Sequence, residues 1–120
     1  MVSNQTELML VEDDAESRTT LALILQFEGY KVIAFSNGAE ALNHLAHSSP
    51  PHLIIMDLRM PVMDGSSFRL AMLRDPRLAK IPVVIVTAFE PPAAASLSAL
   101  RVLRKPVNVD TLLATIREYC

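Results

Sequence analysis

Acidic side chains directly follow two apolar runs of this 120-residue chain. Glu12, Asp13 and Asp14 end the first run, and Asp57 ends the run 53–56. If both runs are parallel strands of one sheet, their carboxyl ends meet at the edge where open α/β folds bind ligands. Carboxylates about 4–6 Å apart repel one another, so such a cluster favours a divalent cation. Ligands that are all oxygen atoms favour Mg²⁺.

Two side chains suited to phosphate chemistry follow later apolar runs. Thr87 ends the run 81–86, and Lys105 stands just past the weaker run 100–103. A hydroxyl and an ammonium group can orient and neutralise a phosphoryl group, whose charge is spread over its equatorial oxygens. Taken alone, Asp57 could be a cap, a metal ligand or a nucleophile. Together with the other acids, the hydroxyl and the ammonium group, Asp57 is the candidate nucleophile, which would form an aspartyl phosphate.

The elements that must position these residues alternate along the chain. Each apolar run precedes a segment with helical spacing, and Asp14, Asn37 and Asn108 are the expected N-caps of three of these helices. The predicted strands are residues 8–11, 31–35, 53–56, 81–86 and 100–103. Alternation of this kind predicts a doubly wound α/β fold, with a parallel sheet and helices on both faces. Residues 1–120 are expected to form one domain.

Composition excludes several classes of protein. A net charge of −2 argues against a strongly basic nucleic-acid binder, and no direct binding to nucleic acid is expected. Cys120 is the single cysteine, so the chain has no internal disulfide. Residues 1–7 lack the apolar core of a signal peptide, and no apolar run approaches the length of a membrane span. These features predict a cytoplasmic domain without membrane association.

The chain resembles the receiver domain of two-component response regulators over nearly its whole length. The resemblance implies a flavodoxin-like strand order, 2-1-3-4-5. The thirty-residue step from Asp57 to Thr87 also fits that family. The matching motifs are Val11-Glu12-Asp13-Asp14, Met56-Asp57-Leu58-Arg59-Met60-Pro61-Val62-Met63-Asp64-Gly65, Val86-Thr87-Ala88 and Lys105-Pro106.

The resemblance implies roles for the residues that match. Asp57 would accept a phosphoryl group from a phosphohistidine of a histidine kinase or a histidine phosphotransfer protein. Glu12, Asp13 and Asp57 would hold Mg²⁺, with Asp13 a direct ligand and the backbone carbonyl of Arg59 completing the protein ligands. Such a domain is a phosphorelay switch that assists its own phosphorylation and dephosphorylation, and it is not expected to be an enzyme in the ordinary sense.

The remaining matches concern the response to phosphorylation. Thr87 would be the hydroxyl that moves toward the phosphoryl group, Lys105 would pair with that group, and the peptide bond between Lys105 and Pro106 would be cis. An attached effector domain or a downstream protein would read the resulting conformation.

The region before Lys105 departs from the family pattern. Ser98-Ala99 stands where the family has Gly-Ala, and Val102 stands where it has an aromatic residue. The segment between Thr87 and Lys105 is also about four residues shorter, roughly one helical turn. The fourth helix is therefore expected to be short or irregular, and activation is expected to proceed without an aromatic gate.

Two other functions fit part of this pattern. A phosphohydrolase of the haloacid-dehalogenase type also uses an aspartate at a strand end, but it needs a second aspartate two positions later, where this chain has Arg59. That class also uses the first strand, whereas Asp57 follows the third. The stronger alternative is a degenerate receiver that binds a partner without being phosphorylated, and the altered residues 88–104 keep it open.

Overall fold

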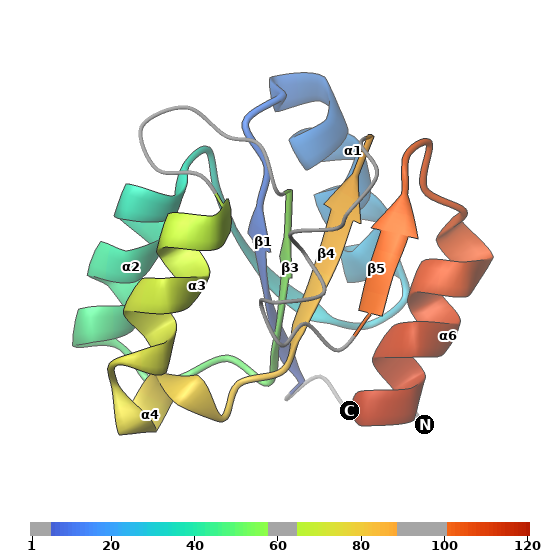
Figure 1. Ribbon diagram of the computed structural model, residues 1–120. Coiled ribbons are helices and arrows are strands. Elements are labelled where there is room, and N and C mark those ends of the chain that lie inside the picture. Colours follow the sequence, from blue (N-terminus) through green and yellow to red (C-terminus); the bar gives the residue numbers. More distant parts are fainter. Residues whose placement is uncertain (1–5, 58–64, 89–100) are drawn as a thin grey trace.

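The computed structural model describes residues 6–57, 65–88 and 101–120. Strands and helices alternate along the chain (Figure 1). The strands are β1 (Glu7–Val11), β2 (Lys31–Phe35), β3 (Leu53–Met56), β4 (Val83–Thr87) and β5 (Arg101–Arg104). The helices are α1 (Ala15–Phe27), α2 (Gly38–His47), α3 (Gly65–Leu73), α4 (Pro76–Ala79) and α6 (Val109–Tyr119). No helix among these residues is long and apolar enough to cross a bilayer.

The five strands form one parallel sheet in the order β2-β1-β3-β4-β5, which confirms the predicted fold and strand order. Helices α1 and α6 cover one face, and α2 and α3 cover the other (Figure 1). Alternate side chains of each central strand enter opposite cores. In β3, Ile54 and Met56 pack with Phe68 of α3, whereas Leu53 and Ile55 pack with Leu25 of α1. Burial on both faces explains why β3 and β4 read as continuous apolar runs.

The predicted caps begin their helices as expected. Asp14 accepts a hydrogen bond from the backbone N–H of Ser17 at 2.8 Å. Asn37 and Asn108 accept equivalent bonds, each from the backbone N–H three residues on, at 2.9 and 3.0 Å. Gly29 follows α1 with a φ of 99°, a value that glycine adopts without steric cost. The side chain of Glu40, in the first turn of α2, accepts a hydrogen bond from the Ser36 hydroxyl at 3.3 Å.

A one-turn helix that the sequence did not predict follows α3. Asp75 and Pro76 lie just past the end of α3 and begin α4, because the Asp75 side chain accepts a hydrogen bond from the backbone N–H of Arg77 at 2.9 Å. Proline suits this first helical position, since it has no N–H to satisfy. The predicted fourth helix falls within residues 89–100, which lie outside the described part of the chain.

Arg77 is expected to stabilise the fold by capping α2 from a neighbouring element. Its guanidinium donates to the carbonyl of Ser48 at 3.0 Å and to the carbonyl of Leu45, both at the C-terminal end of α2. A cation bound there also suits the helix dipole. We expect Arg77→Ala to lower the free energy of unfolding by roughly 1–2 kcal/mol in denaturant titrations. Arg74→Ala, at an exposed neighbouring position, is the matched control and should change it little. Equal losses in the two variants would contradict this capping role.

Candidate functional site

The ends of β1 and β3 lie side by side, and so do the ends of β4 and β5. Val11 of β1 is in register with Met56 of β3, and the N–H of Asp57 donates to the Val11 carbonyl at 3.1 Å. On the other side, the N–H of Lys105 donates to the Thr87 carbonyl at 2.8 Å. Each bond extends a strand pairing by one residue. The backbone therefore determines the positions of the Cα atoms of Asp57 and Lys105.

Lys105 joins the two halves of this edge through its ammonium group. Its Nζ donates to Oε1 of Glu12 and to Oδ2 of Asp57, each at 2.7 Å. The Glu12 and Asp57 side chains are only 3% and 10% exposed, whereas that of Lys105 is 26% exposed. Two acids from different strands, both screened from water, therefore share a single cation.

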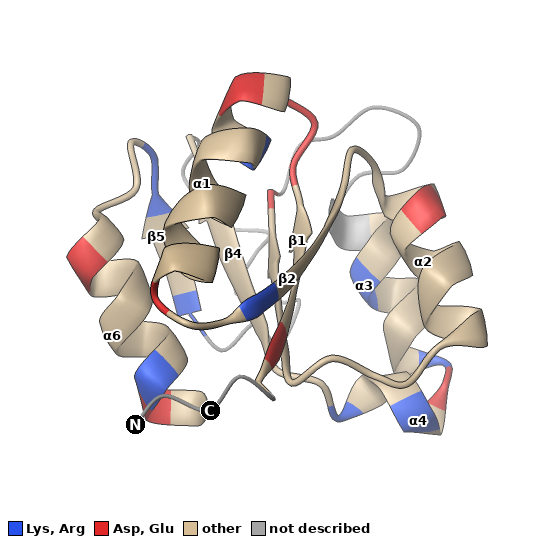
Figure 2. Cartoon of the chain, turned by 180° about the vertical axis from the view of Figure 1, so that it is seen from behind, with Lys and Arg blue, Asp and Glu red and all other residues tan. Residues whose placement is uncertain are grey.

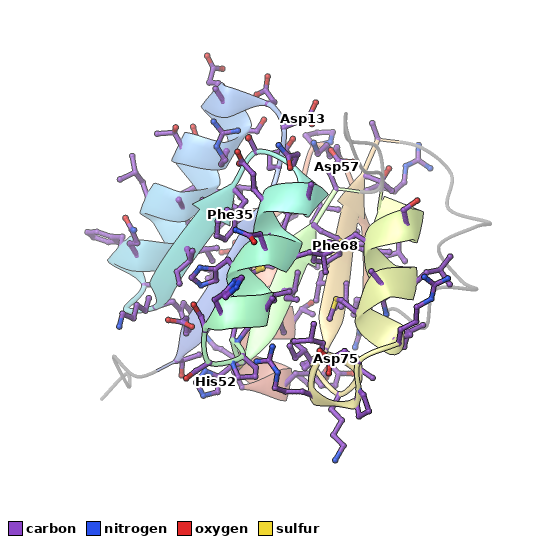
Figure 3. All side chains as sticks on the ribbon, turned by 90° about the vertical axis from the view of Figure 1, so that its left-hand side faces the viewer. Asp13, Phe35, His52, Asp57, Phe68 and Asp75 are labelled. Carbon is purple, nitrogen blue, oxygen red and sulfur yellow. The ribbon has the colours of Figure 1, made fainter. Side chains whose placement is uncertain are left out.

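Asp13 completes a cluster of three carboxylates. One oxygen of each of Glu12, Asp13 and Asp57 lies within 4.8 Å of the others. Carboxylate oxygens are the ligands that Mg²⁺ prefers, and these three side chains would hold such an ion. Figure 3 shows Asp13 and Asp57 together at one end of the sheet, with His52 and Asp75 at the other end. Figure 2 shows acidic positions at the ends of β1 and β3 and at the start of α1. The donors therefore fit a hard divalent cation.

Burial and hydrogen bonding shift the pKa values of Glu12 and Lys105. Burial raises the pKa of Glu12, and the hydrogen bonds from Lys105 and from the backbone of Asp14 only partly offset it. Burial acts to lower the pKa of Lys105, but its hydrogen bonds to Asp57 and Glu12 outweigh burial and raise it. Lys105 is thus held charged. A desolvated Glu12 carboxylate gains from any further positive charge placed beside it.

The loop between β1 and α1 is held by a residue that the sequence did not single out. Nη1 of Arg18 donates to the carbonyl of Glu12 at 2.8 Å and to the carbonyl of Asp13 at 3.3 Å. The only sequence signal for this role is a cation in the first turn of a helix, where the dipole disfavours it. Asp14 acts at the same loop: its N–H donates to Oε2 of Glu12 at 3.1 Å, and the hydrogen bonds from Ser17 lower the pKa of Asp14.

The remaining predicted site residues lie as follows. Thr87 is fully buried at the end of β4, and the register places it one residue further along the sheet than Asp57. The peptide bond between Lys105 and Pro106 is cis, as the resemblance implies. Arg59, the predicted carbonyl ligand, lies outside the described residues. Val102, at the expected aromatic position, is a partly buried residue that packs against the core on the α2–α3 side.

A groove of about 340 Å³ opens beside the carboxylates. It runs between α1 and the segment that joins β5 to α6, with Glu12 and Lys105 among its lining residues. Leu21, Ile24 and Val109 supply apolar walls. The charged cluster is therefore adjacent to a surface that combines apolar and polar contacts.

Known proteins match this chain along most of its length. A family model described as "Response regulator receiver domain" matches residues 8–117. The curated relatives include a probable chemotaxis protein CheY from Rhizobium etli, 32% identical over 119 residues, which are 96% of this chain and 92% of that protein. They also include the polar-differentiation response regulator DivK from Brucella anthropi, 31% identical over 116 residues, which are 93% of this chain and 94% of that protein. Among solved structures, a response regulator receiver protein from Pseudomonas putida has a TM-score of 0.88 at 25% identity, covering 98% of this chain and 99% of that one.

Proposed function

This chain belongs to the family of response regulator receiver domains, and on that premise we propose that it is a phosphorelay switch whose phosphoacceptor is Asp57. Members of this family are signalling domains and not enzymes in the ordinary sense. The observation that carries the proposal is the convergence of Glu12, Asp13, Asp57 and Lys105 on one sheet edge. Each of these residues follows a strand, and each is of the chemical type that phosphoryl transfer to a carboxylate needs.

The proposed step transfers a phosphoryl group from a donor phosphohistidine. A carboxylate oxygen of Asp57 attacks phosphorus, the phosphorus–nitrogen bond breaks, and the imidazole leaves with the bonding electron pair and takes up a proton. The product is an acyl phosphate on Asp57. Lys105 already donates to the Asp57 carboxylate, so its ammonium is placed to pair with the charge that the phosphoryl group brings. The hydroxyl of Thr87 is the proposed sensor of that charge.

Glu12, Asp13 and Asp57 would hold Mg²⁺, and the carbonyl of Arg59 is the proposed further ligand. The bound ion supplies positive charge that offsets repulsion between the acids and the incoming phosphoryl oxygens. The protein contributes the placement of the carboxylates, the exclusion of water around Glu12 and Asp57, and the cation of Lys105.

The proposed donor is a histidine kinase or a histidine phosphotransfer protein, and it must bring an imidazole to the open side of the cluster. The groove between α1 and the β5–α6 segment begins at Glu12 and Lys105, so it supports an approach over α1. Apolar walls would bind the donor surface, while the carboxylates receive the phosphoryl group. We further propose that a downstream protein or an effector domain reads the phosphorylated conformation, and that the chain acts in the cytoplasm.

Removal of the metal should stop the reaction. We expect acetyl phosphate, or a phosphorylated histidine donor, to add one phosphoryl group to the chain in the presence of Mg²⁺, as measured by intact mass. Excess EDTA should reduce labelling to background, because the three carboxylates then lack the charge that neutralises the incoming group. Restoring Mg²⁺ should restore labelling. Equal labelling with and without the metal would refute the proposed role of the carboxylate cluster.

A further inference from the structure

We propose that Arg18 is the positioning residue of the metal site: its guanidinium clamps the backbone that carries Glu12 and Asp13, so it sets the affinity for Mg²⁺ without touching the ion. This inference rests on the proposed function, since it concerns the same carboxylate cluster. One nitrogen, Nη1, bonds the carbonyls of both residues, at 2.8 and 3.3 Å. Helical side chains lean toward the N-terminus of their helix, which lets Arg18 reach back over the loop.

The three carboxylates differ in what holds them. Those of Glu12 and Asp57 are buried and bonded to Lys105, and that of Glu12 also accepts from the N–H of Asp14. The side chain of Asp13 is exposed, and within the described ranges no hydrogen bond or ion pair anchors its carboxylate. Its place within 4.8 Å of the other two is therefore set by the backbone of the loop. Arg18 binds the carbonyl of Asp13 itself.

The position of Arg18 is otherwise unfavourable for a cation. It is the fourth residue of α1, close to the positive end of the helix dipole. The backbone carbonyls of Glu12 and Asp13 supply the compensating partial negative charge. A guanidinium suits this task because its planar array of donors can bond several acceptors, whereas a neutral side chain of similar length cannot.

Substitution of Arg18 separates positioning from simple electrostatics, because the two predict opposite changes. Removing a positive charge next to a cation site should tighten Mg²⁺ binding by Coulomb attraction alone. If Arg18 acts by positioning, Arg18→Met should weaken it, by about tenfold or more, as for other residues that orient metal ligands. Arg18→Lys keeps the charge and one donor group, so its Mg²⁺ affinity should lie between those of the wild type and Arg18→Met.

The measurement is Mg²⁺ titration of the unphosphorylated protein, by calorimetry or by NMR shifts of the loop amides. Arg117→Met is the matched control: it removes the same charge from α6, where Arg117 pairs with Glu28 at 3.8 Å, and it should leave the Mg²⁺ affinity unchanged. In labelling assays, Arg18→Met should need more Mg²⁺ for half-maximal rate yet reach the wild-type rate at saturating Mg²⁺. In the absence of metal, backbone amides of the β1–α1 loop should exchange faster in Arg18→Met than in the wild type.

Arg18→Met that binds Mg²⁺ as tightly as wild type, or more tightly, would overturn the positioning role and leave the proposed function standing. If the wild type itself neither binds Mg²⁺ nor becomes labelled, the proposed function fails and this inference fails with it. Should Arg18→Met not fold, Arg18→Gln takes its place with the same expected and contradicting outcomes.

Discussion

Asp57→Asn is expected to abolish Mg²⁺-dependent labelling of this chain by acetyl phosphate or a phosphohistidine donor. The amide lacks the anionic oxygen that attacks phosphorus, so the rate should fall by two orders of magnitude or more, roughly as when other nucleophiles are removed. The fold should survive, because the asparagine oxygen can still accept the hydrogen bond that Lys105 donates to residue 57. Intact mass after incubation with the donor measures the effect.

Asp75→Asn is the matched control for this change. It is chemically the same substitution, at the opposite end of the sheet (Figure 3), and asparagine caps helices as well as aspartate. Labelling should be unchanged. If Asp57→Asn were labelled as fully as the wild type, Asp57 would not be the phosphoacceptor. If neither the wild type nor Asp57→Asn were labelled, the degenerate receiver, which binds a partner without phosphorylation, would become the better account.

Lys105→Met is expected to have the largest effect on stability. Without metal, it leaves the buried carboxylates of Glu12 and Asp57 with no shared cation. Breaking a buried ion pair by removing one partner costs about 3–5 kcal/mol. The partial exposure of Lys105 should reduce this to about 2–3 kcal/mol, measured by denaturant titration in EDTA.

Magnesium should reverse part of this loss. The variant carries one positive charge fewer beside the cluster, so its Mg²⁺ affinity should rise and added Mg²⁺ should stabilise it more than it stabilises the wild type. Lys80→Met, at an exposed position after α4, is the control and should change neither quantity. A Lys105→Met protein as stable as wild type in EDTA, or one with weaker Mg²⁺ binding, would contradict the proposed shared-cation arrangement.

The order of strands and helices and the parallel sheet could be predicted from the sequence, because the strongest sequence signals are local. Apolar runs of strand length marked β3 and β4, and asparagine or aspartate before a helical pattern marked the caps. The alternation of the two element types determined the parallel sheet. Strand ends in a parallel sheet share an edge, so the meeting of Glu12, Asp57 and Lys105 could be expected as well.

Contacts between distant residues could not be predicted in the same way. The bonds that Arg77 makes to the end of α2 depend on how two helices lie in space, and no local pattern encodes them. The α4 turn was missed because Asp75-Pro76 indicates the end of one helix as strongly as the start of another. Arg18 was missed because its partners are backbone carbonyls, which leave no trace in the sequence.

Reductive trapping of the labelled protein tests the central claim most directly. Borohydride converts an acyl phosphate on aspartate to homoserine, and peptide mass mapping then identifies the residue that carried the phosphoryl group. The account predicts homoserine at position 57 alone, and only in samples labelled in the presence of Mg²⁺. Conversion at another residue, or at position 57 irrespective of the metal, would contradict it.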